Sequence, residues 1–550
     1  MKYLSTPPFF SGSRSFWICV LIGIISFLIY ELHDLREPFA HGHTRWAEAY
    51  TYWFARAHMD FGAGITHGLN VEGVTKSGEP IFYLSALPLV GLVQAAVVSM
   101  MGGEYWTIRV LPLITTLLFV GLLAVFSYRT IGARAAPLAV LLLLGMPYVL
   151  EYGASNAGRL ILVTAFGLAG YLGYSRFLLT RKHQPLMVSA AMFACGMCFG
   201  WHAGFMALAV IAHLWFQDLP VRSKFVATFM LGAVLGGVVI AVLLQQGFAT
   251  GDFLYPLRRA LERGGSPHAQ GASITWTALL QLQASRYWSY YGPVVAGLSV
   301  YWFVRRLLPR PSWSTTDTWA VLAWLPGLVF GLLLRDAAYR HDFLMLGFLP
   351  GAVLIATLGL LNLMDDLERA PVARPKGKRV AALAAGLLLG IHAVGAVRSA
   401  QSFERQEHAD LVGGAARLAW YLRQVPDDGR LMADWSVGMA SRVDGRTGER
   451  YVSLQPFIDY LVRRPVRVVS DVGDLRKQLC KAGQPDGKLI LLQAKKEENA
   501  GAKRARIVDG VAVGKVAVPP EWISRQQDFD NVRVLHLNTL AAPECIAGQD

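Results

Sequence analysis

Apolar runs of about twenty residues recur along the first 400 positions, and this feature constrains the fold more than any other. A run of this length is what an α-helix needs to cross the roughly 30 Å hydrocarbon core of a bilayer. The chain has 550 residues, of which 54% are hydrophobic and only 16% are charged, whereas soluble chains carry about 25% charged residues. The sequence therefore predicts an α-helical polytopic membrane protein.

Eleven segments are predicted to cross the membrane, each with ends uncertain by a few residues. They are 15–31, 107–128, 135–151, 157–178, 185–200, 201–216, 223–247, 287–304, 317–334, 342–362 and 380–397. The first follows Lys2 and Arg14, as a signal sequence would. Because no small-residue cleavage site comes after it, we expect an uncleaved anchor.

The net charge of +14 is distributed in a way that indicates topology. Lys and Arg cluster at the ends of predicted spans, and the positive-inside rule assigns these clusters to the cytoplasm. From Arg129 onward the spans then alternate without conflict, so that 151–157, 248–286 and 335–341 fall outside. No basic groove with interleaved aromatic residues accompanies the charge, so nucleic acid is not an expected partner.

The apolar run 80–101 decides the number of spans. If it crossed the membrane as well, Arg129 would lie outside the cell, against the positive-inside rule. We therefore predict that 80–101 lies at the outer interface or dips in and returns. Residues 32–106 then form one long outer segment, which follows the first of eleven spans. Twelve spans are the open alternative.

Residues 398–550 are far more polar than the rest and follow a last span that is predicted to exit outward. Short β-type runs alternate here with helix-like pieces, which predicts a small extracytoplasmic α/β domain after a transmembrane domain at 1–397. Cys480 and Cys545 would lie in an oxidising compartment, where their pairing is left open. The β-type runs are 430–434, 466–470, 488–493 and 532–538.

The outer segment carries much polar and aromatic chemistry, "HGHTRWAEAYTYWFARAHMDFG" from His41 to Gly62. On a helix over 44–58, Tyr52 and Ala55 share a face with Glu48, because they follow it by four and seven residues. An acid at the outer surface, with aromatic neighbours that can hold a sugar ring, is a candidate general base. The open alternative is an interfacial amphipathic helix with a solvated Glu48.

The order of these motifs resembles the GT-C glycosyltransferases over about residues 15–365. More narrowly, it resembles the dolichyl-phosphate-mannose protein mannosyltransferase and aminoarabinose transferase group. The motifs that carry the resemblance are "AEAYTYWFARAHMDFG", "GGEYWTIRVLPLI", "PYVLEYGASNAGR" and "RDAAYRHDFLMLGFLPGAVLIA". The resemblance implies transfer of a sugar from a polyprenyl-phosphate carrier outside the membrane, and it also implies that the Pro-led helix after Pro80 lies in the outer loop.

The chain departs from this family at positions that bear on the chemistry. The family usually reads Asp-Glu where this chain has Ala47 before Glu48. If the family's Asp removes the proton from the acceptor hydroxyl, Glu48 is the expected base here. His43 is the second choice, since an imidazole also suits this role at neutral pH.

Cations of the outer face are expected to contact the carrier phosphate. The Arg109 guanidinium can hold a phosphate bidentately and stabilise it as the leaving group; in the alternative, Arg109 extends to lipid head groups. Glu79 replaces a basic residue of the family, and Lys76 takes over its contact. Arg159 stands near the place of a second family acid. Arg159, Arg340 and His341 are expected to make the remaining donor or acceptor contacts.

An aromatic patch, "RYWSYYGP" at 286–293, lies at the outer end of a predicted span. Such patches commonly form the interfacial belt of a membrane protein. A platform for a lipid tail or a sugar is the alternative.

Together these features predict a glycosyltransferase of the cell inner membrane, with its active face and C-terminal domain outside. It would move a sugar from a polyprenyl-phosphate carrier to an acceptor hydroxyl on a cell-surface lipid, glycan or protein. No cofactor is expected, and "HGH" at 41–43 lacks a third metal ligand. Two alternatives stay open, a non-catalytic scaffold of surface-polysaccharide assembly and a transporter of a lipid-linked sugar.

Overall fold

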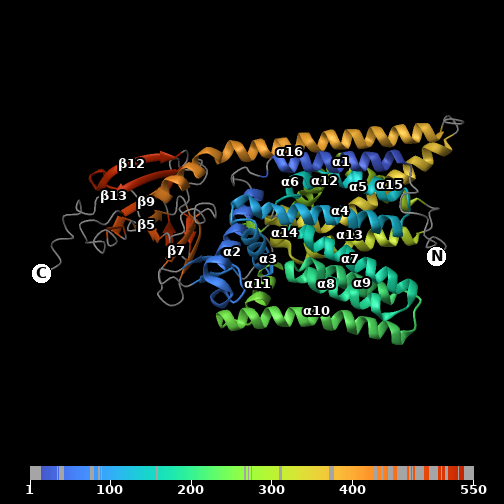
Figure 1. Ribbon diagram of the computed structural model, residues 1–550, viewed down its shortest axis with the longest axis horizontal. Coiled ribbons are helices and arrows are strands. Elements are labelled where there is room, and N and C mark those ends of the chain that lie inside the picture. The colour runs from blue at the N-terminus through green and yellow to red at the C-terminus, as the bar shows by residue number, and fades with distance from the viewer. Residues whose placement is uncertain are drawn as a thin grey trace. The chain divides into compact units, whose positions relative to one another are not determined.

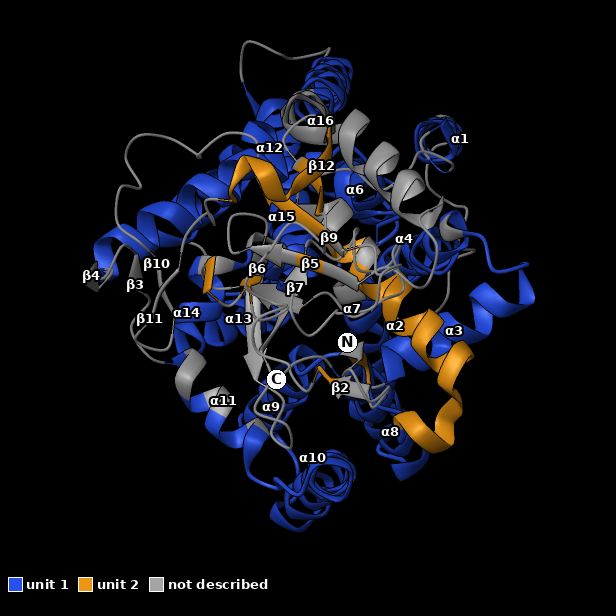
Figure 2. Ribbon diagram, turned by 90° about the vertical axis from the view of Figure 1, so that its left-hand side faces the viewer, with its two compact units in different colours: residues 1–37, 67–69, 84–404 blue, residues 38–66, 70–83, 405–550 orange. Residues whose placement is uncertain are grey.

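The protein divides into two compact units, which Figure 2 shows in different colours. Unit 1 comprises residues 1–37, 67–69 and 84–404, and unit 2 comprises 38–66, 70–83 and 405–550. The structure, a computed structural model, describes residues 14–33, 35, 43–74, 80–83, 87, 89–155, 159–264, 268–269, 272–273, 275–308, 313–370, 377–424, 430–434, 438–443, 450–454, 467–469, 472–473, 475–476, 489–494, 506–508, 511–513, 518–529 and 532–537.

Unit 1 is built almost entirely of helices, and its long helices α1, α4 and α10 run in similar directions (Figure 1). Each of the eleven segments predicted to span the membrane lies largely in helices here, although 135–151 is divided between two helices and 157–158 lie outside the described residues. The elements are α1 (Arg14–His33), α3 (Leu89–Met100), η2 (Tyr105–Arg109), α4 (Val110–Thr130), α5 (Ala135–Leu144), α6 (Pro147–Tyr152), α7 (Arg159–Thr180), α8 (His183–Phe199), α9 (His202–Trp215), α10 (Val221–Thr250), α11 (Tyr255–Gly264), β3 (His268–Ala269), β4 (Ala272–Ser273), α12 (Trp276–Leu307), α13 (Thr315–Leu333), α14 (Arg335–Arg340), η4 (Asp342–Phe348), α15 (Leu349–Arg369) and α16 (Gly377–Gln424), whose residues after Glu404 belong to unit 2.

Six helices of the described chain are long and apolar enough to cross a bilayer. They make this a multi-pass membrane protein, while eleven crossings and their direction stay a prediction. Helix α3 has twelve residues and is about 18 Å long, so as a straight helix it is too short to cross the hydrocarbon core. Because α5 and α9 are also short, with 10 and 14 residues, length alone does not decide whether 80–101 spans, and this stays a prediction.

Two breaks inside the helices of unit 1 make room for His392 of α16. His392 donates from Nε2 to the Leu142 carbonyl, near the end of α5, at 2.9 Å. A Cβ at Gly145 would lie 2.6 Å from this ring, so only glycine fits between α5 and α6. Helix α12 kinks at Gly292, whose φ of 82° also favours glycine, and the same ring lies against it.

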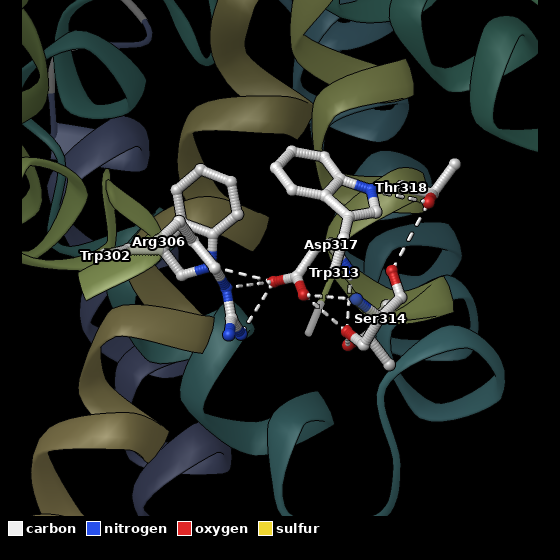
Figure 3. Close-up of polar contacts among 7 residues, drawn as sticks. Trp302, Arg306, Trp313, Ser314, Asp317 and Thr318 are labelled. Carbon is white, nitrogen blue, oxygen red and sulfur yellow. Dashed lines mark hydrogen bonds and ion pairs between the residues drawn. The ribbon is translucent and has the colours of Figure 1, made fainter. Parts of the chain in front are cut away.

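The last turns of α12 are joined to α13 through a buried carboxylate, Asp317 (Figure 3). Its Oδ1 accepts from Trp302 Nε1 at 3.0 Å and pairs with the Arg306 guanidinium at 2.9 Å. Its Oδ2 accepts from the Ser314 hydroxyl and backbone N–H, which completes a capping box at the start of α13. Every oxygen of this buried acid therefore has partners, as burial requires.

Unit 2 contains α2 (His43–Thr66), a hairpin and a seven-stranded mixed sheet. The hairpin is β1 (Val71–Val74) with β2 (Pro80–Phe82). The order in the sheet is β12 (Ile523–Phe529), β13 (Val532–Leu537), β9 (Leu489–Ala494), β5 (Arg430–Asp434), β8 (Arg467–Val469), β7 (Arg450–Leu454) and β6 (Gly438–Val443), and a separate hairpin pairs β10 (Arg506–Val508) with β11 (Val511–Val513).

All four predicted β-type runs are strands of this sheet, namely β5, β8, β9 and β13. Strand β5 pairs in parallel with both β8 and β9, and the other pairs are antiparallel. One face packs on a small core of Met432, Leu475, Leu491, Leu535 and Leu537. Cys480 and Cys545 lie outside the described residues, so their pairing stays a prediction.

Candidate active site

Helix α2 presents the predicted face around Glu48, and this face is buried. Glu48 and Tyr52 are each 1% exposed and Ala55 is 0% exposed. The helical spacing of these three residues is therefore confirmed. Because Glu48 is buried, the alternative of a solvated carboxylate on an interfacial helix is wrong. A carboxyl group that is shielded from water is suited to general acid–base catalysis.

Aromatic rings gather on a neighbouring stripe of α2. The Tyr50 ring meets the Phe54 ring edge-on at 5.3 Å between centroids, and Tyr83 stacks on Phe54 at 5.5 Å. Tyr83 follows β2, and its backbone N–H donates to the Asn70 carbonyl, just before β1, at 2.7 Å, which extends the pairing of the hairpin by one bond. The rings therefore fix the hairpin against α2.

A histidine that the sequence analysis did not single out, His58, holds the bend at the end of α2. The Thr66 hydroxyl donates to the Gly62 carbonyl at 3.0 Å, where φ is 75°. Because that donation uses its only proton, the contact of 2.9 Å between Thr66 Oγ1 and His58 Nδ1 must be donated by His58. Burial lowers the pKa of His58 to about 4, so its ring is neutral.

Three candidates of the outer segment are described in part or not at all. His43 is the first residue of α2, but its side chain lies outside the described part of the structure. Lys76 and Glu79, between β1 and β2, lie outside the described residues. Their roles stay predictions.

Arg109 is the most buried charged candidate of unit 1. It ends the short helix η2, just before α4, and it is 1% exposed. Its Nη1 donates to the Leu35 carbonyl, beyond the end of α1, at 2.8 Å. A side chain held inside the protein in this way does not extend to lipid head groups, so that alternative is wrong. A buried guanidinium at the end of a helix suits an anion.

The other candidates of unit 1 lie at the same end of the bundle as Arg109. Thr116, two turns into α4, donates from its hydroxyl to the Gly153 carbonyl at 2.7 Å, just before α7 begins at Arg159. Helix η4 packs against α7 and α14. It follows His341, which is half-buried after α14 ends at Arg340. The side chains of Arg159 and Arg340 lie outside the described part of the structure.

The proposed base, Glu48, belongs to unit 2 and the proposed phosphate contact, Arg109, belongs to unit 1. Their pairing stays a prediction. Among the described residues, no group of three or more His, Cys, Asp or Glu side chains is placed to hold a metal ion.

The aromatic patch at 286–293 divides in two. Trp288 is 57% exposed, as a residue of an interfacial belt would be, whereas Tyr291 is fully buried. Tyr290 instead meets Tyr148 of α6 at 4.8 Å between ring centroids, and Tyr148 meets Tyr152 at 4.4 Å. The patch is thus partly a packing contact between α6 and α12.

Comparison with known proteins gives matches of fold and of family. Residues 85–244 match the family model of the dolichyl-phosphate-mannose-protein mannosyltransferases. The fold is similar to that of ArnT from Cupriavidus metallidurans bound to undecaprenyl phosphate, with a TM-score of 0.60 at 14% identity over 95% of this chain and 98% of that one. It is also similar to the archaeal oligosaccharyltransferase AglB from Archaeoglobus fulgidus, in complex with an inhibitory peptide and a dolichol-phosphate. There the TM-score is 0.53 at 12% identity, over 88% and 69% of the two chains.

The comparison with curated protein sequences gave no match. The structural matches nevertheless extend over nearly the whole chain, well beyond the segment that matches the family model. The resemblance read from the sequence is therefore confirmed, and the chain has the fold of the GT-C glycosyltransferases.

Proposed function

We propose that the protein is a glycosyltransferase that takes a sugar from a polyprenyl-phosphate carrier. The acceptor would be a hydroxyl on a cell-surface lipid, glycan or protein, and the reaction would take place at the outer face of the cell inner membrane. One observation carries this proposal, the match of fold over nearly the whole of both chains with ArnT bound to undecaprenyl phosphate. The domain at 398–550 would lie on the same side and cover the site or dock the acceptor.

The proposed reaction is a direct displacement with inversion at the sugar. Glu48 takes the proton of the acceptor hydroxyl while the acceptor oxygen bonds to the anomeric carbon. The bond from that carbon to the phosphate oxygen breaks, and polyprenyl phosphate leaves. Arg109 stabilises the charge that develops on the phosphate, which is the main electrostatic need of such a step. The burial of both side chains supports these roles, because a charge acts more strongly away from water.

The segment from α14 to η4 supplies the remaining contacts in this proposal. His341 lies half-buried between these two helices, and Arg340 precedes it. Arg159 begins α7, against which η4 packs. The helix ends that carry these three residues lie at the end of the bundle that carries Arg109, which supports a role in binding an anionic carrier head group.

A non-catalytic scaffold is the second candidate, and one observation favours it. Ala47 stands where the family usually has an Asp, and it is a neighbour of Glu48 on α2. If Glu48 cannot replace that acid, the protein keeps the fold and loses the reaction. The transporter has no comparable support, because the matched fold is that of glycosyltransferases.

The test is sugar transfer from labelled polyprenyl-phosphate sugars in membranes that contain the wild type or Glu48→Gln. Glu521→Gln is the matched control, because Glu521 is exposed and belongs to the same unit as Glu48. We expect Glu48→Gln to lower the transfer rate by about 100-fold or more, with equal protein levels and a control that keeps the wild-type rate. Equal transfer by Glu48→Gln would remove Glu48 from the mechanism. No transfer by any of the proteins, across several donors, would favour the scaffold.

A further inference from the structure

The first half of α12 holds the end of α14 through two long polar side chains. Arg286 donates from Nη1 to the Ala338 carbonyl at 2.6 Å and from Nη2 to the Tyr339 carbonyl at 2.9 Å. Gln283, one turn earlier, donates from Nε2 to the same Ala338 carbonyl at 2.7 Å. Two consecutive carbonyls are thus bound by one planar guanidinium, which fixes their direction as well as their position.

These carbonyls are ones that α14 cannot satisfy alone. The last carbonyls of a helix have no partner within it, and α14 has only six residues. A helix this short does not persist without tertiary contacts. The contacts from α12 therefore determine where α14 ends and how the chain continues into Arg340 and His341.

The same helix also holds the chain just after these two residues. The Tyr291 hydroxyl donates to the Met345 carbonyl, and two residues later His202 Nε2 lies 3.1 Å from the Gly347 carbonyl. The backbone from Arg340 to Leu344 is thus fixed on both sides, by Arg286 before it and by Tyr291 after it. This is the segment that carries two of the proposed site residues.

The contacts of Arg286 differ from those of an ordinary structural arginine. Within the described part of the chain it contacts carbonyl oxygens and no carboxylate. A cation beside the carbonyl end of a helix is favourable. An arginine that served only to join two helices could be neutralised by an acid, as the other end of α12 shows.

We propose that Arg286, together with Gln283, is a positioning residue of the proposed site, which sets the backbone at Arg340 and His341 so that this segment meets the carrier phosphate. The inference rests on the proposed function. The sequence alone does not indicate the contact between Arg286 and Ala338, because these residues are 52 positions apart in the chain.

The first test separates binding of the donor from the chemical step. For Arg286→Met we expect the KM for the polyprenyl-phosphate sugar to rise between about 10- and 100-fold, with kcat within about threefold of the wild type. Arg286→Lys should recover part of the loss, because an ammonium can bind one carbonyl but not two. Arg222→Met, which removes an exposed arginine of α10, should match the wild type. A kcat loss at unchanged KM would overturn the positioning role.

The second test needs no transfer activity. In purified protein without its native cysteines, His341→Cys is treated with a water-soluble maleimide, with and without Arg286→Met. We expect faster alkylation, by about fivefold or more, when the contacts to α14 are lost, and no change with Arg222→Met. An unchanged rate would overturn the inference even if sugar transfer is shown. A faster rate in a protein that transfers no sugar would retain the contact and reject only the proposed function.

Discussion

The two ends of α12 both carry arginines, but the arginines have different partners. Near Leu307, Arg306 pairs with the buried Asp317, and Arg305 pairs with Asp366 of α15. Near Trp276, Arg286 binds two neutral carbonyls. Within the described part of the chain, positive charge is therefore neutralised by acids at one end of the helix and contacts neutral carbonyls at the other.

We interpret this difference as two roles along one helix, a structural role near Leu307 and a role in the proposed site near Arg286. At the neutralised end, Asp317 joins α12 to α13 and Asp366 joins α12 to α15, and the charges of Arg305 and Arg306 serve these contacts. At the other end, Arg286 lies with the buried Arg109 and the half-buried His341 at the side of the bundle where α4 begins and α14 ends. A site that binds a lipid phosphate needs positive charge at this end of the bundle.

The largest effect is expected at the neutralised end. Asp317→Ala leaves the Arg306 guanidinium, the Trp302 N–H and the Ser314 hydroxyl without their acceptor. Breaking a buried pair in this way costs about 3–5 kcal/mol, so the unfolding temperature in detergent should fall sharply. Thermal unfolding followed by tryptophan fluorescence measures this. An Asp317→Ala protein as stable as the wild type would break the comparison, since it would show that this end needs no acid.

At His58, by contrast, we expect the stability of the fold to depend on pH. His58 donates to Thr66 and is neutral, because burial holds its pKa at about 4, below the ordinary value of 6.5. As the pH falls, His58 is protonated near pH 6.5 in the unfolded chain but only near pH 4 in the folded protein. Protonation therefore favours unfolding in this window, and the stability present above pH 6.5 is lost as the pH falls toward 4. We expect the unfolding temperature to fall over this window, and His58→Gln to show a smaller slope. Equal slopes in both proteins would contradict the assignment.

The smallest effect is expected at Asp366, which is 44% exposed. It accepts from the Tyr301 hydroxyl at 2.5 Å and pairs with Arg305. Pairs open to solvent contribute between 0 and about 1 kcal/mol. Asp366→Asn should therefore shift the unfolding temperature by only a few degrees. A loss as large as that of Asp317→Ala would show that the two acids are equivalent.

Much of the fold could be predicted from the sequence because its signals are local. Apolar runs gave the helices of unit 1, and alternating polarity gave β5, β8, β9 and β13. The face of Glu48 followed from the helical repeat. In each case the residues that determine the element are its own neighbours in the chain.

The contacts that complete the candidate site could not be predicted, because their partners are distant in the chain or are backbone atoms. Arg286 binds carbonyls 52 and 53 residues away, and backbone carbonyls leave no mark in a sequence. His392 binds a carbonyl 250 residues away, and it explains Gly145 only once both are in place. The tautomer of His58 depends on a bend at Gly62, which no sequence motif predicted.

The most direct test of the account is the affinity for undecaprenyl phosphate, measured on purified protein with Arg109→Met and with Arg305→Met. The two variants remove one arginine each, from opposite ends of the bundle, and Arg305 belongs to the exposed pair of small effect. The account predicts a Kd at least about tenfold higher for Arg109→Met, equivalent to about 1.4 kcal/mol, and an unchanged Kd for Arg305→Met. Equal affinities in both variants and the wild type would contradict the account, because Arg109 would then not contribute to binding of the carrier phosphate.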